Sequence, residues 1–542
     1  MVLALSLGLA IGRPALAFQF DFDDPDFKGA WDNTLKYNAA WRVAGRSNNL
    51  VSATPTGGNN NQDDGDRNFT KGLISNRINL LSELDLAYRK TGLRVSSAAW
   101  YDSVYNGKTG NNQASTLNQT STAAGEFPTA TRDLMGHHVE LLDAFAYSSF
   151  GIGKESTATV RAGRHTQVWG ESLFFGSNGM AGTMAPTDVQ KLQAVPNTQF
   201  KEAMMPVNQL SGNLQLNSDV TLGAFYQLEW EPNRLAPSGS YFSTSDTTGA
   251  GAESLKAGPF RYDRTADVSA RDQGQYGLQT KFHLPFSDAD YGLYFVRYHD
   301  KSPQVVQSNF LTGPANGVLG TYALVYPEKV SAFGASASNT YGPVNLAGET
   351  SIRYNAPLVS AIPAVTGGAQ SDNNNNPRYA VGKTAHANLS MIWSIAPNAL
   401  FNESSLVAEV AGNRRLSIKQ NAAALDPNTT RNAWGFRMVF TPTYRQVFDG
   451  LDLSFPIGTG YNPQGRSSAV SSFNNNFIDG GGDLSIGMTG SYLDAWRFSL
   501  NYTHYYGSKR GMFVVGQVPP PRTYDQSLGD RDFVAFSVYR TF

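Results

Sequence analysis

The sequence predicts an all-β fold: a closed antiparallel transmembrane β-barrel of about 18 strands, or 16 if one hairpin is miscounted, with an inward-folded loop or plug. Hydrophobic residues recur at every second position in many segments, and long connections alternate with short ones. Charged residues make up 16% of the 542 residues and aromatic residues 12%, whereas a soluble domain has about 25% charged residues. Barrel strands show an apolar face to lipid and a polar face to the lumen, which explains this composition.

The first segment, residues 1–17, is expected to be a secretory signal peptide. It reads MVLALSLGLAIGRPALA, an apolar run that ends in the cleavage pattern Ala15-Leu16-Ala17. The run is shorter than the about 20 residues of a membrane-spanning helix. Because a basic start is missing, we expect the segment to be truncated at its N-terminus. Residues 18–542 are then expected to form the outer-membrane barrel of a Gram-negative bacterium.

The first expected strand shows the pattern that repeats along the chain. Trp31, Leu35 and Tyr37 fall on one face, and Lys36 and Asn38 fall on the other, as in a strand with one apolar side. The strands are predicted at residues 29–44, 74–88, 93–105, 138–150, 157–165, 207–216, 220–231, 274–284, 291–300, 321–339, 344–354, 381–395, 404–413, 432–444, 450–458, 483–492, 495–506 and 532–542.

The connections favour a membrane barrel over a soluble β-sandwich or a β-solenoid. Short joints, such as residues 217–219, alternate with long polar ones, such as 45–73 and 507–531. Short periplasmic turns and long extracellular loops are typical of outer-membrane barrels. Sandwich strands average about 5–6 residues, which is shorter than many of these, and no fixed repeat indicates a solenoid. An even strand count places both termini in the periplasm.

The last strand carries a further signal. Val534, Phe536, Val538 and Phe542 lie on one face, and Phe542 ends the chain. This resembles the signal that the outer-membrane assembly machinery reads, so this machinery and outer-membrane lipid are expected partners. Arg540 departs from the apolar residue that is usual at its position, and its long side chain is expected to reach the membrane interface.

One long connection, residues 166–206, is unusually apolar. It contains four of the ten methionines, together with Trp169, Phe174 and Phe175. An exposed loop rarely has so much apolar surface, so the segment is expected to fold into the barrel as a plug or constriction, with a short helix after Thr187 or Asp188. Its methionines either adapt to apolar ligands or only pack the plug against the wall, and the sequence favours neither alternative.

The stretch Arg161-Ala-Gly-Arg-His-Thr-Gln-Val-Trp-Gly-Glu-Ser172 resembles the signature of a proteobacterial outer-membrane β-barrel family of unknown function. At His165 the family is expected to have glutamine. The resemblance implies a genomic context beside RND-type (MmpL-like) lipid transporters and a companion periplasmic protein, both of which are expected partners. Further matches are Asp63–Phe69, Lys201-Glu202, Pro206–Asn208, Phe225–Glu231, Gly292–His299, Tyr326–Glu328 and Gly348–Arg353.

The expected function is therefore an outer-membrane conduit or binding protein for lipids or other hydrophobic compounds, working with an RND-type transporter. The alternatives are a substrate-specific porin for polar solutes, since a barrel of this size can hold water, and an outer-membrane hydrolase. Apolar residues are expected to line the path, and charged ones to hold the plug or contact a polar head group. The candidate residues are Trp169, Glu171, Phe174, Phe175, Met180, Met184, Lys201, Glu202, Glu229 and Trp230.

Other chemistry has little support. A net charge of −1 gives no field for nucleic acid. The seven histidines show no metal-binding spacing, no G-x-S-x-G elbow is present, and neither an enzyme nor a cofactor is expected. The oxygen-rich loop Asn59–Asp66 allows a Ca²⁺ site but lacks the spacing of an EF-hand, so a solvated loop is the stronger expectation.

Overall fold

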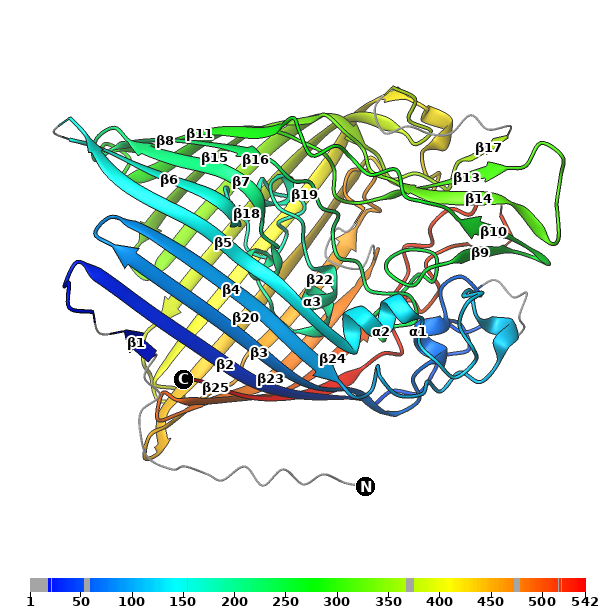
Figure 1. The fold of residues 1–542 in the computed structure, drawn as a ribbon, viewed down its shortest axis with the longest axis horizontal. Coiled ribbons are helices and arrows are strands. Elements are labelled where there is room, and N and C mark those ends of the chain that lie inside the picture. The colour runs from blue at the N-terminus through cyan, green and yellow to red at the C-terminus, as the bar shows by residue number, and fades with distance from the viewer. Residues whose placement is uncertain are drawn as a thin grey trace.

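The computed structural model describes residues 18–20, 22–52, 59–153, 155–366, 375–471, 478–514, 516–517 and 519–542. Residues 1–17, the expected signal peptide, lie outside this part of the chain. Figure 1 shows a barrel of tilted strands with loops, short helices and a small second sheet gathered at one end. No helix in the described ranges is long and apolar enough to span a membrane.

The barrel wall is one antiparallel sheet of 18 spanning strands, as predicted. The short β1 (Phe18–Phe20) adds to the end of β2, and β21 and β22 are two halves of one spanning strand. The wall strands are β2 (Phe27–Arg42), β3 (Gly72–Tyr88), β4 (Thr91–Asp102), β5 (His137–Ile152), β6 (Ser156–His165), β7 (Val207–Gln215), β8 (Val220–Gln227), β11 (Gln275–Leu284), β12 (Ala289–Tyr298), β15 (Val330–Tyr341), β16 (Val344–Pro357), β18 (Val381–Ile395), β19 (Glu403–Gln420), β20 (Asn432–Phe448), β21 (Leu451–Ser454), β22 (Ile457–Gln464), β23 (Gly481–Tyr492), β24 (Trp496–Tyr506) and β25 (Phe533–Thr541).

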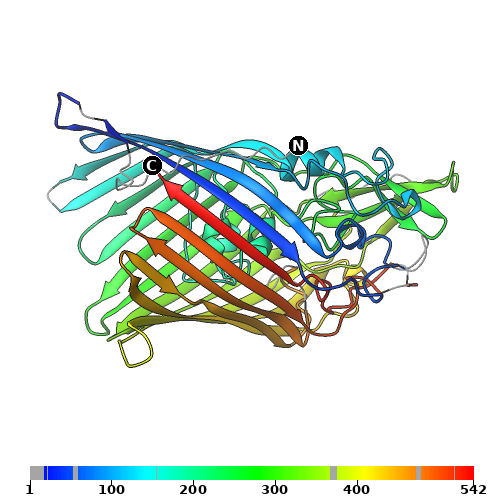
Figure 2. The same ribbon diagram turned by 90° about the horizontal axis from the view of Figure 1, so that it is seen from below.

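The first and last spanning strands close the barrel. β2 pairs with β25 from Thr34 opposite Thr541 to Arg42 opposite Phe533, and Figure 2 shows the blue β2 beside the red β25. Phe542 exchanges two backbone hydrogen bonds with Asn33, at 2.8 and 2.9 Å. A closed sheet has no free edge and satisfies its backbone groups within the wall, as a membrane interior requires.

Successive side chains of the wall strands point alternately toward lipid and toward the lumen. On β18, Leu389 is 60% exposed on the outer face, whereas its neighbour Asn388 is 6% exposed and faces inward. The same alternation separates Leu293 from Tyr294 on β12. Near the last turn, the guanidinium of Arg540 lies 5.4 Å from the ring centroid of Trp496. The apolar belt therefore faces outward, and the polar positions face the lumen.

Long loops build a second sheet at one end of the barrel (Figure 1). Its strands, in the order β17-β13-β14-β10-β9, are β9 (Ser254–Ala257), β10 (Phe260–Arg264), β13 (Gln304–Asn309), β14 (Val318–Val325) and β17 (Ala364–Thr366). The prediction of one wall strand at 321–339 was therefore wrong. Residues 321–325 belong to β14, the wall strand β15 begins at Val330, and Pro327 lies between them.

The helices are short and lie in connections. They are α1 (Asp64–Arg67), α2 (Thr129–Met135) and α3 (Val189–Ala194), with 3₁₀ turns at Ala114–Thr116, Ala181–Thr183, Phe200–Ala203 and Ala422–Ala424. The helix expected after Thr187 or Asp188 is α3, and its N-cap is Asp188, whose side chain accepts a hydrogen bond from the Lys191 N–H at 2.9 Å.

Candidate functional site

The connection from β6 to β7, residues 166–206, enters the barrel and forms a plug. Both ribbon views place this teal segment, with α3, inside the ring of strands. The inward fold predicted from its apolar composition is therefore what the structure has.

Two glutamates on the wall hold the backbone of the plug. Glu349 on β16 accepts hydrogen bonds from the N–H groups of Glu171 at 2.8 Å and Met180 at 3.1 Å. Glu409 on β19 accepts from the N–H groups of residues 173–175, at up to 3.1 Å. Each carboxylate is buried, and a buried charge needs hydrogen-bond partners. The N–H groups of the plug are these partners, and they would themselves be unpaired without the carboxylates.

A wall arginine binds the next turn of the plug. The guanidinium of Arg353 donates to the carbonyl oxygens of Ser177 at 3.1 Å and of Asn178 and Gly179 at 2.8 Å. The Asn178 side chain in turn donates to the side-chain oxygen of Asn388 at 2.8 Å. A Cβ atom on Gly179 would lie 2.0 Å from Glu349 Oε1, so only glycine allows this close approach.

The predicted apolar residues of the plug pack against the wall. Trp169, Met180 and Met184 form one cluster with wall side chains that include Phe225, and the rings of Trp169 and Phe225 lie 5.0 Å apart. Phe174 and Phe175 pack against Ala411 and Val439 in a second cluster. Both methionines are fully buried, so most of these side chains only pack the plug against the wall, whereas Trp169 also borders a cavity toward the short turns.

The charged candidates are dispersed. Glu171 lies 3.7 Å from Lys281 on β11, so this charged residue of the plug pairs with the wall. Lys201 and Glu202 are exposed. Glu229, just beyond the end of β8, pairs with Arg164 on β6 at 2.8 Å, and Trp230 packs on Tyr326. The structure therefore brings Glu171 together with the apolar candidates, but not Lys201, Glu202, Glu229 or Trp230.

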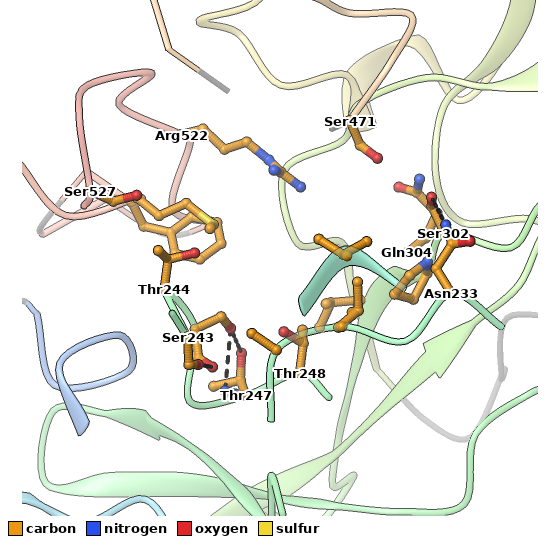
Figure 3. Close-up of a pocket in the computed structure, with 18 of the residues that line it drawn as sticks. Asn233, Ser243, Thr244, Thr247, Thr248, Ser302, Gln304, Ser471, Arg522 and Ser527 are labelled. Atoms are coloured by element: carbon orange, nitrogen blue, oxygen red, sulfur yellow. Dashed lines mark hydrogen bonds between the residues drawn. The ribbon is translucent and has the colours of Figure 1, made fainter. Parts of the chain in front are cut away.

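A cavity lies between the plug and the long loops (Figure 3). Its empty volume is about 1160 Å³, and both polar and apolar side chains line it. Arg522 points into it opposite Ser471 and Ser302, and is the one charged side chain among the described lining residues. The polar lining residues are Gln193, Asn233, Ser243, Thr244, Ser245, Thr247, Thr248, Ser302, Gln304, Ser360, Ser471, Arg522 and Ser527.

Polar cavities continue on both sides of the plug. A second one, of about 590 Å³, shares Asn233, Ser302 and Gln304 with the first and is also lined by Lys301 and Arg353. Burial lowers the pKa of the Lys301 ammonium to about 8. A third cavity, of about 770 Å³, lies toward the short turns and is lined by Thr157, Thr159, Gln167, Val168, Trp169, Asn213, Gln215, Thr221, Gln279 and Lys281.

Sequence reasoning missed the residues that hold the plug and line the cavity. Glu349 and Arg353 lie in a segment that resembles the family pattern, and Glu409 occupies a lumen-facing position of its strand. The signal available in the sequence was a charged residue at a lumen-facing position of a predicted strand. Arg522 lies in a loop and has no period-two pattern that would single it out.

Comparison with known proteins gives one match over the full length. A model of a protein family of unknown function matches residues 1–542, and no curated protein matches the sequence.

Solved structures of bacterial channels are similar at low identity. OccAB3 of Acinetobacter baumannii is 9% identical, with 95% of this chain and 99% of that chain covered and a TM-score of 0.44. OccK2 (OpdF) of Pseudomonas aeruginosa, solved with glucuronate, is 8% identical over 95% and 98%, with a TM-score of 0.41. The outer membrane channel DcaP of Acinetobacter baumannii is 8% identical over 96% and 99%, with a TM-score of 0.38. Such values indicate nothing about the solute of this chain.

Proposed function

Since the chain belongs to the DUF1302 family of proteins of unknown function, its function has to come from its own structure, and we propose that it is a substrate-specific outer-membrane channel for small polar solutes. The outward apolar belt and closed wall support insertion in an outer membrane, where proteins span as barrels. The long loops then face the cell exterior, and both termini face the periplasm.

The observation that carries this proposal is that polar side chains line the three cavities around the plug, together with apolar surface in the cavity on the loop side. The cavity on the loop side has thirteen polar residues among the 22 that line it, and Thr, Asn, Gln and Lys side chains line the cavity on the short-turn side. Water and hydrogen-bonding solutes are stable against such surfaces. The plug lies between these cavities, and most of its large apolar side chains pack against the wall, so the cavities keep polar groups in their lining.

Arg522 supports a preference for anionic solutes. A guanidinium offers paired donors that match a carboxylate, and the nearby hydroxyl groups can bind other polar atoms of the same solute. The apolar side chains Leu235, Phe242 and Phe513 line the same cavity. A small solute with a carboxylate and a compact apolar part therefore fits its chemistry.

The lipid route implied by the family resemblance has less support. Trp169, Phe174 and Phe175, which were expected to line it, are enclosed between plug and wall. Cooperation with an RND-type transporter and its periplasmic companion stays a prediction, and co-purification of the three proteins from detergent-solubilised membranes would test it.

Liposome swelling tests the channel. Purified protein should admit small polar solutes, and carboxylates faster than uncharged solutes of equal size. Arg522→Gln should slow carboxylate entry roughly tenfold, because a hydrogen bond to a charged group contributes about 1.5–3 kcal/mol. Arg522→Lys, the matched control, keeps the charge and should retain most of the preference. Liposomes that admit no polar solute, but exchange a fluorescent lipid, would contradict the proposal.

A further inference from the structure

Three aspartates meet in the loop layer at the mouth of the barrel. Asp63 and Asp64 lie at the start of α1, and Asp246 comes from the long loop between β8 and β9. One carboxylate oxygen from each residue lies within 4.8 Å of the other two. All three residues are 0% exposed. Three negative charges at this place would repel one another strongly, because burial excludes the water that would weaken the repulsion.

The arginines near the three aspartates pair mainly with other carboxylates. Asp66 binds both Arg42 at 3.0 Å and Arg531 at 3.1 Å. Asp63 pairs with Arg67 at 3.0 Å. Within the described ranges, no Lys, Arg or His nitrogen lies within 4.0 Å of a carboxylate oxygen of Asp64 or Asp246. Two of the three clustered carboxylates therefore have no direct cationic partner.

The same carboxylates have unused oxygen atoms. Oδ1 of Asp63, of Asp64 and of Asp246 is buried and has no hydrogen-bond partner in the part of the chain that is described. The side-chain oxygen of Asn118 is also buried without a partner, and the Asn118 backbone N–H lies 3.5 Å from Asp64 Oδ2. Buried acceptors without a donor are costly, and several of them at one place point to a ligand that supplies positive charge.

The loops are shaped to bring these oxygens together. A Cβ atom on Gly65 would lie 2.5 Å from the Ser240 carbonyl oxygen, so glycine allows α1 to approach the loop of Asp246. The Asp64 N–H donates to Asp246 Oδ2 at 3.3 Å, and the Asp246 N–H donates to the Asn61 carbonyl at 2.8 Å. Asn118 joins the group from the connection between β4 and β5, and its Nδ2 donates to Asn61 Oδ1 at 2.6 Å.

We propose that Asp63, Asp64 and Asp246 bind one calcium ion that ties the loops of the barrel mouth together, with the Asn118 side-chain oxygen as a further ligand. Ca²⁺ takes six to eight oxygen ligands, mostly carboxylates and amide or backbone carbonyls, in a flexible geometry. The acidic group offers no nitrogen or sulfur ligand of the kind that zinc and copper prefer. Two positive charges balance the two carboxylates that lack a direct cationic partner.

This ion would also set the shape of the solute cavity. Asp246 lies between Ser245 and Thr247, and both of these residues line the cavity that Arg522 enters. Fixing Asp246 to α1 fixes this part of the cavity wall. Calcium would thus control access from the loop side, a property that goes beyond the proposed channel function and can be tested without measuring transport.

Calorimetric titration of the full chain in detergent, after chelation with EGTA, tests the site. CaCl₂ alone should bind at one site per chain. Asp64→Asn/Asp246→Asn should weaken this binding at least about a hundredfold, since both unbalanced charges are gone. Asp426→Asn, a buried loop aspartate outside the cluster, is the matched control and should bind as the unaltered protein does. Calcium should also slow cleavage of the loops by protease in the unaltered protein and not in the double variant.

Two results would overturn the calcium site. One is the absence of calcium binding by the unaltered chain, because the carboxylates would then be neutralised by shared protons. The other is equal calcium binding by the unaltered chain and the double variant. If the double variant does not assemble, as judged by its mobility on unheated SDS gels, Asp246→Asn alone replaces it, and the titration of the unaltered chain remains decisive. Neither result depends on which solute the channel passes.

Discussion

Glu409 is one side chain that holds three consecutive backbone N–H groups of the plug, those of residues 173–175, and it also accepts a hydrogen bond from Asn388 at 2.7 Å. No other side-chain type would do this equally well. Asparagine is too short, and glutamine keeps only one oxygen and loses the charge that strengthens hydrogen bonds to N–H groups. The position of the plug therefore depends on a few charged wall residues.

Glu409→Ala is expected to loosen the plug without breaking the wall. Three plug N–H groups would be left unpaired, at about 1–3 kcal/mol for each that stays buried. Planar-bilayer recordings should show frequent conductance fluctuations that the unaltered channel lacks. Glu403→Ala on the same strand removes an exposed pair with Arg445 and should leave the recordings unchanged. Quiet recordings from Glu409→Ala would mean that this carboxylate does not hold the plug.

Lys301 should make the ion selectivity depend on pH. Its pKa, lowered by burial from 10.5 to about 8, predicts a charged side chain at pH 7 and a neutral one at pH 9. Between the two pKa values the unfolded chain holds a proton that the folded chain lacks, so the contribution of Lys301 to stability rises with pH in this window. Reversal potentials in a salt gradient should show anion preference falling from pH 7 to pH 9. Lys301→Met should show the low anion preference at both pH values. If the anion preference of this variant still fell from pH 7 to pH 9, Lys301 would be excluded as the cause.

The individual strands were largely predictable from the sequence because their environment is uniform. Lipid contacts every second residue of a strand, and this selects alternating side chains such as Trp31, Leu35 and Tyr37 on β2. The prediction failed where loop strands show the same alternation. Tyr322 and Leu324 are buried in the second sheet, and their period cannot be distinguished from that of a wall strand.

The two faces of β24 should respond differently to the same charge. Leu500 is 44% exposed on the outer face, near the middle of the strand, whereas the Asn501 side chain faces the lumen. Leu500→Arg should lower the free energy of unfolding by roughly 2–4 kcal/mol, because the charge enters the hydrocarbon core. Asn501→Arg can hydrate its charge in the lumen and should cost much less. Urea unfolding followed by tryptophan fluorescence in lipid vesicles measures both, and equal losses would contradict the facing of this strand.

At the scale of the whole molecule, the barrel wall is easier to predict from the sequence than the contacts inside the barrel. The strand count and the inward fold of residues 166–206 follow from local composition. The pairing of Glu349, Arg353 and Glu409 with the plug does not, because these contacts join residues that are 169 to 236 positions apart. Whether Met180 faces a solute or a wall side chain depends on the shape of the closed barrel, which no local pattern contains.

The orientation of the whole barrel is testable from outside the cell. Pro520 lies in a long loop, and Asp494 lies in a short turn at the opposite end. If the long loops face the exterior, an epitope tag after Pro520 should bind antibody on intact cells, and a tag after Asp494 should bind only after the outer membrane is permeabilised. Both tagged proteins should fractionate with the outer membrane and shift in mobility when heated in SDS. The reverse labelling pattern would place the termini outside the cell.

The anchoring of the plug also constrains the order in which the protein assembles. The plug lies between β6 and β7, but its hydrogen-bond partners Glu349 and Glu409 are on β16 and β19. Contacts between distant parts of a chain form slowly, since closing a long loop costs entropy. The plug can therefore reach its final position, with Met180 and Phe175 covered, only after β16 and β19 have joined the wall. Until then the apolar surface of the plug lacks its final cover from the wall.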